Sequence, residues 1–203
     1  MTSGTLFGST TSPYVRMTRL VRSRSGAESF VAFEVADAWK ESYRAVNPLG
    51  KVPALVLDNG VACLETTLIC RTLMGIGGTD LLPAAQMERV QEEADVALMI
   101  GLLDLGVAFL LEDRRDPAEQ SKTWQARRLR GIEAALPMVE SAARRAARRP
   151  RGYGAIALVS ALDWFSFRHE GRVHWREACP VATEVVDGLL REEDVAKTDP
   201  RNA

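Results

Sequence analysis

TLFGSTTSPYVRMTR, residues 5–19, joins a short apolar strand predicted over Thr5–Phe7 to a helix predicted to begin near Pro13. The connection carries four hydroxyl side chains: Ser9, Thr10, Thr11 and Ser12. A helix start leaves backbone N–H groups without partners and holds the positive end of the helix dipole, so it stabilises a hydroxyl cap or an anion. Pro13 suits the first helical position because its φ is already near the helical value. On these residues alone, Ser12 is either a simple helix cap or part of an anion or thiolate site.

Composition and charge are those of a soluble globular protein. Of the 203 residues 46% are hydrophobic and 26% are charged, and the formal net charge is −1. A chain so close to neutral lacks the basic excess that binding to nucleic acid or to a membrane surface requires. We find no secretory signal and no apolar stretch of the roughly 18 residues that span a membrane. We therefore expect a cytoplasmic protein.

The cysteine and histidine residues do not indicate a metal site or a reactive thiol. The three cysteines, Cys63, Cys70 and Cys179, leave one unpaired in any disulfide scheme and lack metal-ligand spacing. We expect reduced, mostly buried thiols and no metal. His169 and His174 lie near Cys179 in the sequence, but both are expected to be solvated.

The first part of the chain has the pattern of a small sheet domain. Ser29–Val35 is a modest second strand, and the Asn-Gly pair at 59–60 predicts a tight turn in an antiparallel hairpin of Ala54–Leu57 with Val61–Leu64. Glu65-Thr66-Thr67 opens a helix that Gly77-Gly78 ends. The order βαβ-ββα predicts a parallel pair of strands joined by a helix, followed by a hairpin and a final helix, in a compact α/β domain over residues 1–80.

The remainder, residues 81–203, is expected to be an all-α domain, after a linker over Gly77–Pro83. The helical pattern recurs over Met87–Leu111, Trp124–Arg149, Tyr153–Phe167 and Cys179–Leu190. Pro137 lies inside the second of these helices and predicts a kink or a break there.

Four segments occur in a recognisable order: LFGSTTSPYVR at 6–16, NPLGKVPALVLDNG at 47–60, LETTLIC at 64–70 and ALDWFSFR at 161–168. Together they resemble the glutathione transferase superfamily, specifically soluble bacterial members related to its zeta and omega classes. The resemblance implies a thioredoxin-like first domain, an all-helical second domain that carries an electrophile site, and a homodimer.

The resemblance also assigns residues to a glutathione site. Pro53 matches the cis-proline of the family, and Val52 before it would pair through its backbone with the cysteinyl part of glutathione. Glu65-Thr66 matches the acidic-hydroxyl pair that holds the γ-glutamyl end, with the carboxylate receiving the ammonium and Thr66 receiving the carboxylate. The resemblance places Thr11 and Lys51 among the glutathione contacts as well.

Two serines are candidates for activating the glutathione thiol. The zeta-type S-x-x-S pattern points to Ser9, whereas the omega-type C-P-[FY] pattern puts Ser12 in the place of the cysteine. Neither position is a cysteine, so a hydroxyl at the helix start would stabilise the thiolate. The implied activity is transfer of that thiolate to a small hydrophobic electrophile, in detoxification.

Three alternatives remain open on the sequence: a non-catalytic binding or scaffold protein with this fold, a glutathione-dependent isomerase, and an ether-cleaving enzyme. The electrophile would lie against the helical domain, where residues such as Phe109 and Trp164 either line the site or pack the core.

One departure from the family pattern concerns the helix that begins near Tyr153. Gly152 and Ala155 stand where related proteins carry a capping box of Ser or Thr with Asp. Losing such a cap costs about 1 kcal/mol, so Gly154 or a neighbouring loop must compensate. Thr72 replaces a tyrosine that is common after the Ile-Cys pair.

Overall fold

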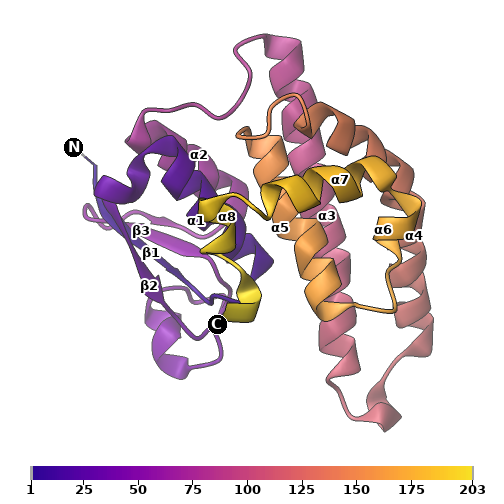
Figure 1. Cartoon of the computed structure of the whole chain (residues 1–203). Coiled ribbons are helices and arrows are strands. Elements are labelled where there is room, and N and C mark those ends of the chain that lie inside the picture. The colour runs from indigo at the N-terminus through magenta and orange to yellow at the C-terminus, as the bar shows by residue number, and fades with distance from the viewer. Residues whose placement is uncertain (1, 203) are drawn as a thin grey trace. The chain divides into compact units, whose positions relative to one another are not determined.

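The computed structural model describes residues 2–202, and the chain forms two compact units (Figure 1). The first unit runs as far as Pro83 and also contains the end of the chain from Glu192, while the second runs from Ala84 to Arg191. The sequence-based division placed everything after residue 80 in the helical domain. The structure differs from it at the end of the chain, because the segment from Glu192 packs with the first unit.

The first unit is built on a four-stranded sheet in the order β2-β1-β3-β4. Strand β1 is parallel to β2 and antiparallel to β3, and β3 is antiparallel to β4. The strands are β1 Gly4–Gly8, β2 Val31–Val35, β3 Ala54–Leu57 and β4 Ala62–Cys63. The predicted parallel pair and hairpin are confirmed, although β4 is shorter than expected.

Two helices of the first unit, α1 Pro13–Ser25 and α2 Thr66–Gly77, pack against each other. Their close approach requires Gly77, where an added Cβ would lie 2.3 Å from the Ser25 carbonyl oxygen. The short 3₁₀ turns are η1 Ala27–Ser29 and η2 Glu41–Ala45. Fully buried apolar side chains from the sheet and both helices make the core: Leu6, Val15, Leu20, Leu55, Ile69 and Leu73.

The second unit is helical, as predicted. Its helices are α3 Gln86–Asp113, α4 Lys122–Ala146, α5 Tyr153–Arg168, α6 Trp175–Ala178 and α7 Pro180–Leu189, with a 3₁₀ turn η3 at Pro117–Glu119. Helix α5 is the central element, because every residue from Tyr153 to Phe165 is buried. The predicted break at Pro137 does not occur, since α4 is continuous. Pro137 lies on its exposed side, where water can satisfy the carbonyl that loses its partner.

Helix α3 shows that the prediction of no stretch as long as a membrane span was wrong. It has 28 residues, and its most apolar window reaches a mean hydropathy of 2.1, so length and composition alone would allow it to cross a membrane. However, α3 packs against α4 and α5. Its buried Asp95 accepts hydrogen bonds from Arg145 Nε and Nη2, both at 2.7 Å. This ion pair ties α3 to α4 within the helical unit, with the Asp95 side chain 10% exposed and the Arg145 side chain 40% exposed.

The start of α5 is capped by a side chain from another helix. Gly152 provides no side-chain cap, but the Gly154 N–H donates to Glu92 Oε1 of α3 at 2.9 Å. Arg149 Nε donates to the other carboxylate oxygen at 3.1 Å. A Cβ at Gly152 would lie 2.8 Å from Glu92 Oε1, so the missing local cap is also what leaves room for Glu92.

Candidate functional site

The strand directions bring the predicted site residues to one edge of the sheet. Strand β1 ends beside the start of β3, because the antiparallel register pairs Phe7 with Ala54. Strand β4 runs antiparallel to β3, so its end and the start of α2 return to the same edge. The connections formed by residues 9–12, 51–53 and 64–65 therefore meet there.

The loop of residues 9–12 is held by hydrogen bonds among its own groups. The hydroxyl oxygens of Ser9 and Thr11 lie 3.1 Å apart, and the Thr11 N–H donates to Ser9 Oγ at 3.4 Å. The Ser12 N–H donates to the Ser9 carbonyl oxygen at 3.2 Å. All four residues are half-buried, so the loop presents a group of hydroxyls that a ligand can reach.

Ser12 is the N-cap of α1, as one of the two sequence interpretations predicted. Its Oγ accepts the Val15 N–H at 3.4 Å, which leaves the hydroxyl hydrogen to donate to an incoming anion. The first turn of α1 contains no acidic residue, so no carboxylate there neutralises the positive end of the helix dipole. A single residue can therefore cap the helix and also stabilise an anion.

The peptide bond between Val52 and Pro53 is cis, as the resemblance implied. Neither the N–H nor the carbonyl of Val52 is hydrogen-bonded to any residue in the part of the chain the structure describes. Val52 lies in a bend just before β3, which begins at Ala54, so its N–H and carbonyl form an open main-chain edge ahead of the strand. Such an edge can pair with the main chain of an extended peptide.

Two residues that the sequence interpretation missed, Tyr43 and Asn47, hold the chain just before this open edge. The Tyr43 hydroxyl and Asn47 Nδ2 donate to the carbonyl oxygen of Lys51, at 3.0 and 2.7 Å. Asn47 is fully buried, and its Oδ1 accepts the Leu49 N–H at 3.0 Å. Burial raises the pKa of Tyr43, so its hydroxyl remains a donor. The Asn-Pro pair at 47–48, typical of a turn, was the available signal.

Glu65 is itself the N-cap of α2. Its Oε1 accepts the Thr67 N–H and its Oε2 accepts the Leu68 N–H, both at 2.9 Å, and the Thr67 hydroxyl also donates to Oε2. Burial acts to raise the pKa of Glu65, but these hydrogen bonds outweigh it and the pKa lies below its usual value. The exposed carboxylate is therefore charged at neutral pH and can receive a cation. Thr66, which follows it, has a hydroxyl with no hydrogen bond to another described residue.

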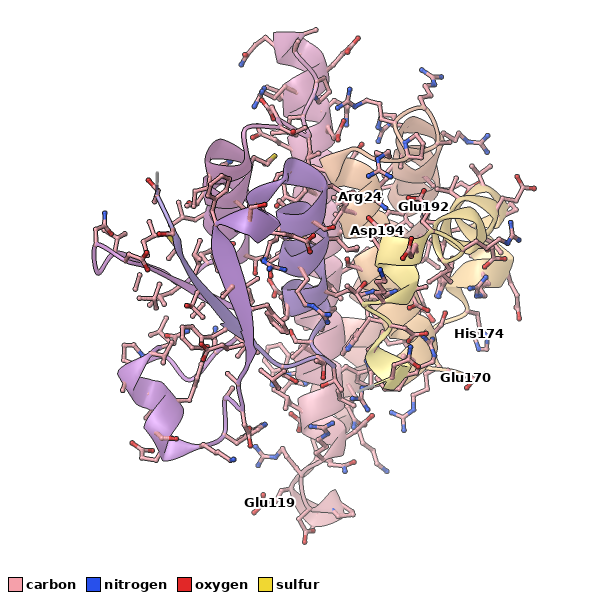
Figure 2. All side chains as sticks on the ribbon, turned by 60° about the vertical axis from the view of Figure 1, so that its left-hand side comes forward. Arg24, Glu119, Glu170, His174, Glu192 and Asp194 are labelled. Carbon is pink, nitrogen blue, oxygen red and sulfur yellow. The ribbon has the colours of Figure 1, made fainter. Side chains whose placement is uncertain are left out.

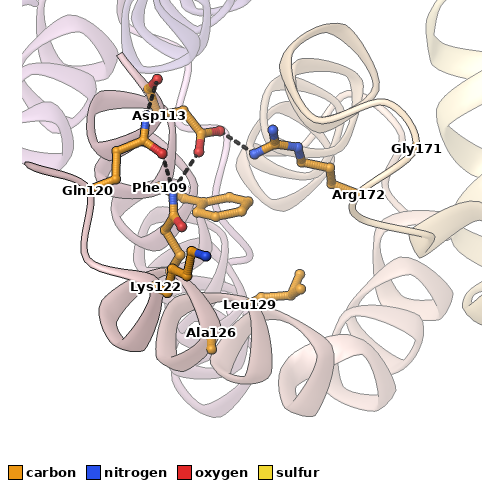
Figure 3. A pocket seen from close by; sticks show the side chains of 9 residues that line it. Phe109, Asp113, Gln120, Lys122, Ala126, Leu129, Gly171 and Arg172 are labelled. Carbon is orange, nitrogen blue, oxygen red and sulfur yellow. Dashed lines mark hydrogen bonds and ion pairs between the residues drawn. The ribbon is translucent and has the colours of Figure 1, made fainter. Parts of the chain in front are cut away.

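The second unit has an open cavity of about 570 Å³ between the end of α3, the start of α4 and the loop that follows α5 (Figure 3). Phe109 and Leu129 supply apolar surface, and Lys122 and Arg172 supply positive charge. The Asp113 carboxylate in the lining is paired with Arg172. The lining therefore combines apolar surface with charged groups, of which Asp113 and Arg172 neutralise each other.

His169 is buried, with 1% of its surface exposed, which corrects the prediction that it is solvated. It stacks on Phe109 and meets Trp164 edge-on, with ring centroids 5.3 Å apart in each pair. Its Nε2 lies 3.0 Å from the Gly106 carbonyl oxygen. Burial lowers the pKa of His169 by more than this hydrogen bond raises it, so the ring is neutral at neutral pH. His174 is exposed, as expected.

The three cysteines are buried and unpaired, as predicted. Burial, together with the nearby Glu140 carboxylate, raises the pKa of Cys179 to about 11, so this thiol is not a nucleophile at neutral pH. Within residues 2–202, no three side chains of His, Cys, Asp or Glu are grouped so that they could hold a metal ion.

The chain is similar to glutathione transferases both in sequence and in structure. Residues 6–77 match the family described as Glutathione S-transferase, N-terminal domain. Over 202 residues the chain is 27% identical to the uncharacterized GST-like protein YibF of Escherichia coli K12, covering 98% of this chain and 99% of that protein.

Two crystal structures of a glutathione transferase family member from Pseudomonas fluorescens Pf-5 are similar to this structure. One has bound glutathione and superposes with a TM-score of 0.90 at 28% identity, covering 98% of this chain and 99% of that chain. The other has bound S-(propanoic acid)-glutathione and gives a TM-score of 0.85 at 28% identity, covering 98% and 97%. These similarities extend over both units of the chain.

Proposed function

We propose that the chain belongs to the glutathione transferase superfamily, and that the sheet edge described above binds glutathione and activates its thiol. The observation that carries the proposal is the open main chain of Val52 beside cis-Pro53, at the same edge as the helix start at Ser12. Glutathione is an extended peptide with a thiol at its centre, so it can pair with Val52 and direct its sulfur toward that helix start. The glutathione bound in the similar Pseudomonas structure supports this choice of ligand.

The groups around Val52 match the ends of the same ligand. The charged Glu65 carboxylate can receive the ammonium of the γ-glutamyl end, and the Thr66 hydroxyl can donate to its α-carboxylate. Lys51 is exposed and offers a positive charge to the other carboxylate of glutathione. Thr11 belongs to the hydroxyl group that would border the cysteinyl part. The site thus offers a complement to each charged group of the tripeptide.

The thiol is activated by stabilising its thiolate form. The Ser12 hydroxyl donates a hydrogen bond to the sulfur while the α1 dipole adds a positive potential, and both act more strongly on the charged than on the neutral form. Ser9 can play the same part, and Ser12 is our first choice because it lies directly at the helix start. This arrangement corresponds to a serine type related to the zeta and omega classes.

The transfer step forms one carbon–sulfur bond. The thiolate sulfur attacks the electrophilic carbon of a small hydrophobic molecule, and either a leaving group departs with the electron pair or an added proton completes the addition. The S-(propanoic acid)-glutathione bound in the second Pseudomonas structure carries a substituent on sulfur, as the product of such a step would. We assign this chemistry to detoxification.

The test is a calorimetric titration with glutathione, followed by a chromogenic electrophile assay. We expect binding by the wild type and an activity about 100-fold lower in Ser12→Ala, because one donor to the developing charge is removed. Ser9→Ala tests the second candidate, and the exposed Ser42→Ala is the matched control. Absence of binding at millimolar glutathione would refute the site. Full activity in both alanine variants would refute the serine mechanism.

We also propose that the protein is a cytoplasmic homodimer. Two apolar side chains on α3, Met87 and Val90, are 75% and 45% exposed, and apolar surface of this kind favours association between copies. Light scattering should give twice the mass of the chain. Met87→Glu should shift the mass toward the monomer, and a monomeric wild type at micromolar concentration would contradict the proposal.

A further inference from the structure

The chain ends by returning to the first unit, where the short helix α8, Glu193–Ala196, contacts α1 (Figure 1). A 3₁₀ turn η4, Pro200–Asn202, follows it. Val195, Thr198 and Pro200 are all buried. Terminal residues are ordered only when something ties them down, so specific contacts anchor this segment.

The first anchor is Arg24, in the last turn of α1. Its side chain is 1% exposed and meets two carboxylates of the segment. Arg24 Nε donates to Asp194 Oδ2 at 2.7 Å, and Nη2 donates to Glu192 Oε2 at 2.8 Å. Figure 2 shows the three side chains together. A guanidinium so far from water depends on these partners, because burying its charge without them is costly.

The second anchor is Arg16, at the other end of α1. It is 1% exposed, and it donates from Nη2 to the Val195 carbonyl oxygen at 3.2 Å and from Nε to Thr198 Oγ1 at 3.3 Å. The backbone N–H of Arg16 donates to the Ser12 carbonyl oxygen at 3.0 Å. Arg16 therefore links the end of the chain to the turn that carries the Ser12 hydroxyl.

We propose that residues 192–202, the C-terminal clasp, position the first turn of α1 and so direct Ser12 at the glutathione sulfur. The inference rests on the proposed function. Attachment at both ends of α1 opposes sliding and rotation of the helix, and a displacement of about 1 Å is enough to weaken a hydrogen bond to a reacting atom substantially. Arg16, Arg24, Asp194 and Thr198 touch no substrate in this scheme and are positioning residues.

Two substitutions loosen the clasp without deleting it. Asp194→Asn removes one of the two negative charges that face Arg24, and Thr198→Val removes the hydroxyl that accepts from Arg16 while keeping the branched shape. The matched control is Glu193→Gln, because Glu193 lies in the same segment, is exposed and, among residues 2–202, forms its ion pair with Lys197 alone.

Amide hydrogen exchange without ligand reports directly on the first turn of α1. The Val15 N–H donates to Ser12 Oγ and the Arg16 N–H to the Ser12 carbonyl, so their protection measures how firmly that turn is held. We expect exchange about tenfold faster in both clasp variants than in the wild type, and no change in Glu193→Gln. Unchanged exchange in the clasp variants would overturn the proposal, whether or not the chain binds glutathione.

The second readout is the pKa of the bound glutathione thiol, followed by thiolate absorbance against pH. We expect it to rise in both clasp variants, because a displaced Ser12 donates less well, and kcat/KM near neutral pH to fall about tenfold. A clasp that only stabilises the fold would lower the thermal midpoint and leave this pKa unchanged, which would also overturn the proposal. If the wild type binds no glutathione, the proposed site is refuted. The exchange measurement then still tests whether the C-terminal clasp holds the first turn of α1.

Discussion

Helices α2 and α5 each begin beside a glutamate carboxylate, but the two glutamates lie at very different distances along the chain. At α2 the carboxylate belongs to Glu65, which immediately precedes the helix. At α5 it belongs to Glu92 of another helix, 62 residues before the Gly154 N–H that it accepts. The same need, acceptors for unpaired N–H groups, is met locally in one case and through the tertiary structure in the other.

The two caps also differ in whether the glutamate can contact a ligand. The local cap leaves Glu65 exposed at the sheet edge, where its charge can also meet a ligand. The distant cap places Glu92 between α3 and α5, with its side chain only 12% exposed, so it joins two helices of the second unit. We therefore expect loss of Glu65 to affect binding more than folding and loss of Glu92 to affect folding alone.

The largest effect on stability should come from Glu92→Ala. It removes the α5 cap and the partner of Arg149 together, and we expect a loss of about 2 kcal/mol in the free energy of unfolding, measured with urea. Glutathione affinity should be unchanged. The control is Glu88→Ala, an exposed residue of the same helix, and an equal loss in that variant would contradict the capping role.

Gly152→Ser tests whether a local cap can replace the distant one. In the wild type the new Cβ would lie 2.8 Å from Glu92 Oε1, so we expect destabilisation. In the Glu92→Ala background this closest contact is gone and the Arg149 carbonyl oxygen, at 3.1 Å from the new Cβ, remains, so the serine on its extended backbone should restore at most about 1 kcal/mol by capping α5 itself. A double-mutant cycle measures this coupling, and strictly additive effects would show that the two positions do not compete.

Glu65→Gln should have a smaller effect on stability, about 0.5–1 kcal/mol, because an amide oxygen can still accept from the first turn of α2. Glutathione affinity should fall about tenfold, since the charge facing the ammonium is lost. The pKa of Glu65 is lowered in the folded state, so its contribution is present above the unfolded value and lost as pH falls through the folded value. The variant should lack that acid-dependent loss, whereas the exposed Glu34→Gln should retain it.

The smallest effect on stability is expected from the C-terminal ends of α2 and α5. Helix α2 ends at Gly78, with φ 82°, whereas α5 ends at the buried His169. Because burial lowers the pKa of His169, the unfolded chain binds its proton more readily, and stability should decline as pH falls below about 6.5. His169→Phe should reduce this decline in urea unfolding measured across pH. His174→Gln is the control, and an unchanged slope in His169→Phe would contradict the assignment.

The sequence was informative wherever a contact lies within a few residues. Ser12 and Pro13, the Asn-Gly turn and Glu65 before α2 all act over one turn of chain, so their residue types predicted the turn or the helix start. The assignment of Ser12 and Glu65 to a glutathione site came from the resemblance. The resemblance supplied cis-Pro53. It also showed that the local cap at Gly152 is missing, although it did not identify the residue that replaces it.

The failures share one cause. Glu92 and His169 take their roles from neighbours that only packing brings close, and a periodic sequence pattern does not show which distant residue will contact a given position. Helix α3 is apolar enough to resemble a membrane span, and its sequence pattern does not show that it packs against α4 and α5 or that Asp95 pairs with Arg145.

The sequence by itself determined most of the strands and helices and the order of a sheet unit followed by a helical one, because local geometry follows from short-range patterns. The residues proposed for the site came from the resemblance to a known family. Only the tertiary structure decided that residues 192–202 leave the helical part and fasten onto α1, that Glu92 caps α5, and that His169 is buried. Each of these depends on pairing a buried or unsatisfied polar group with a partner far away in the chain, and that pairing is settled by packing in three dimensions.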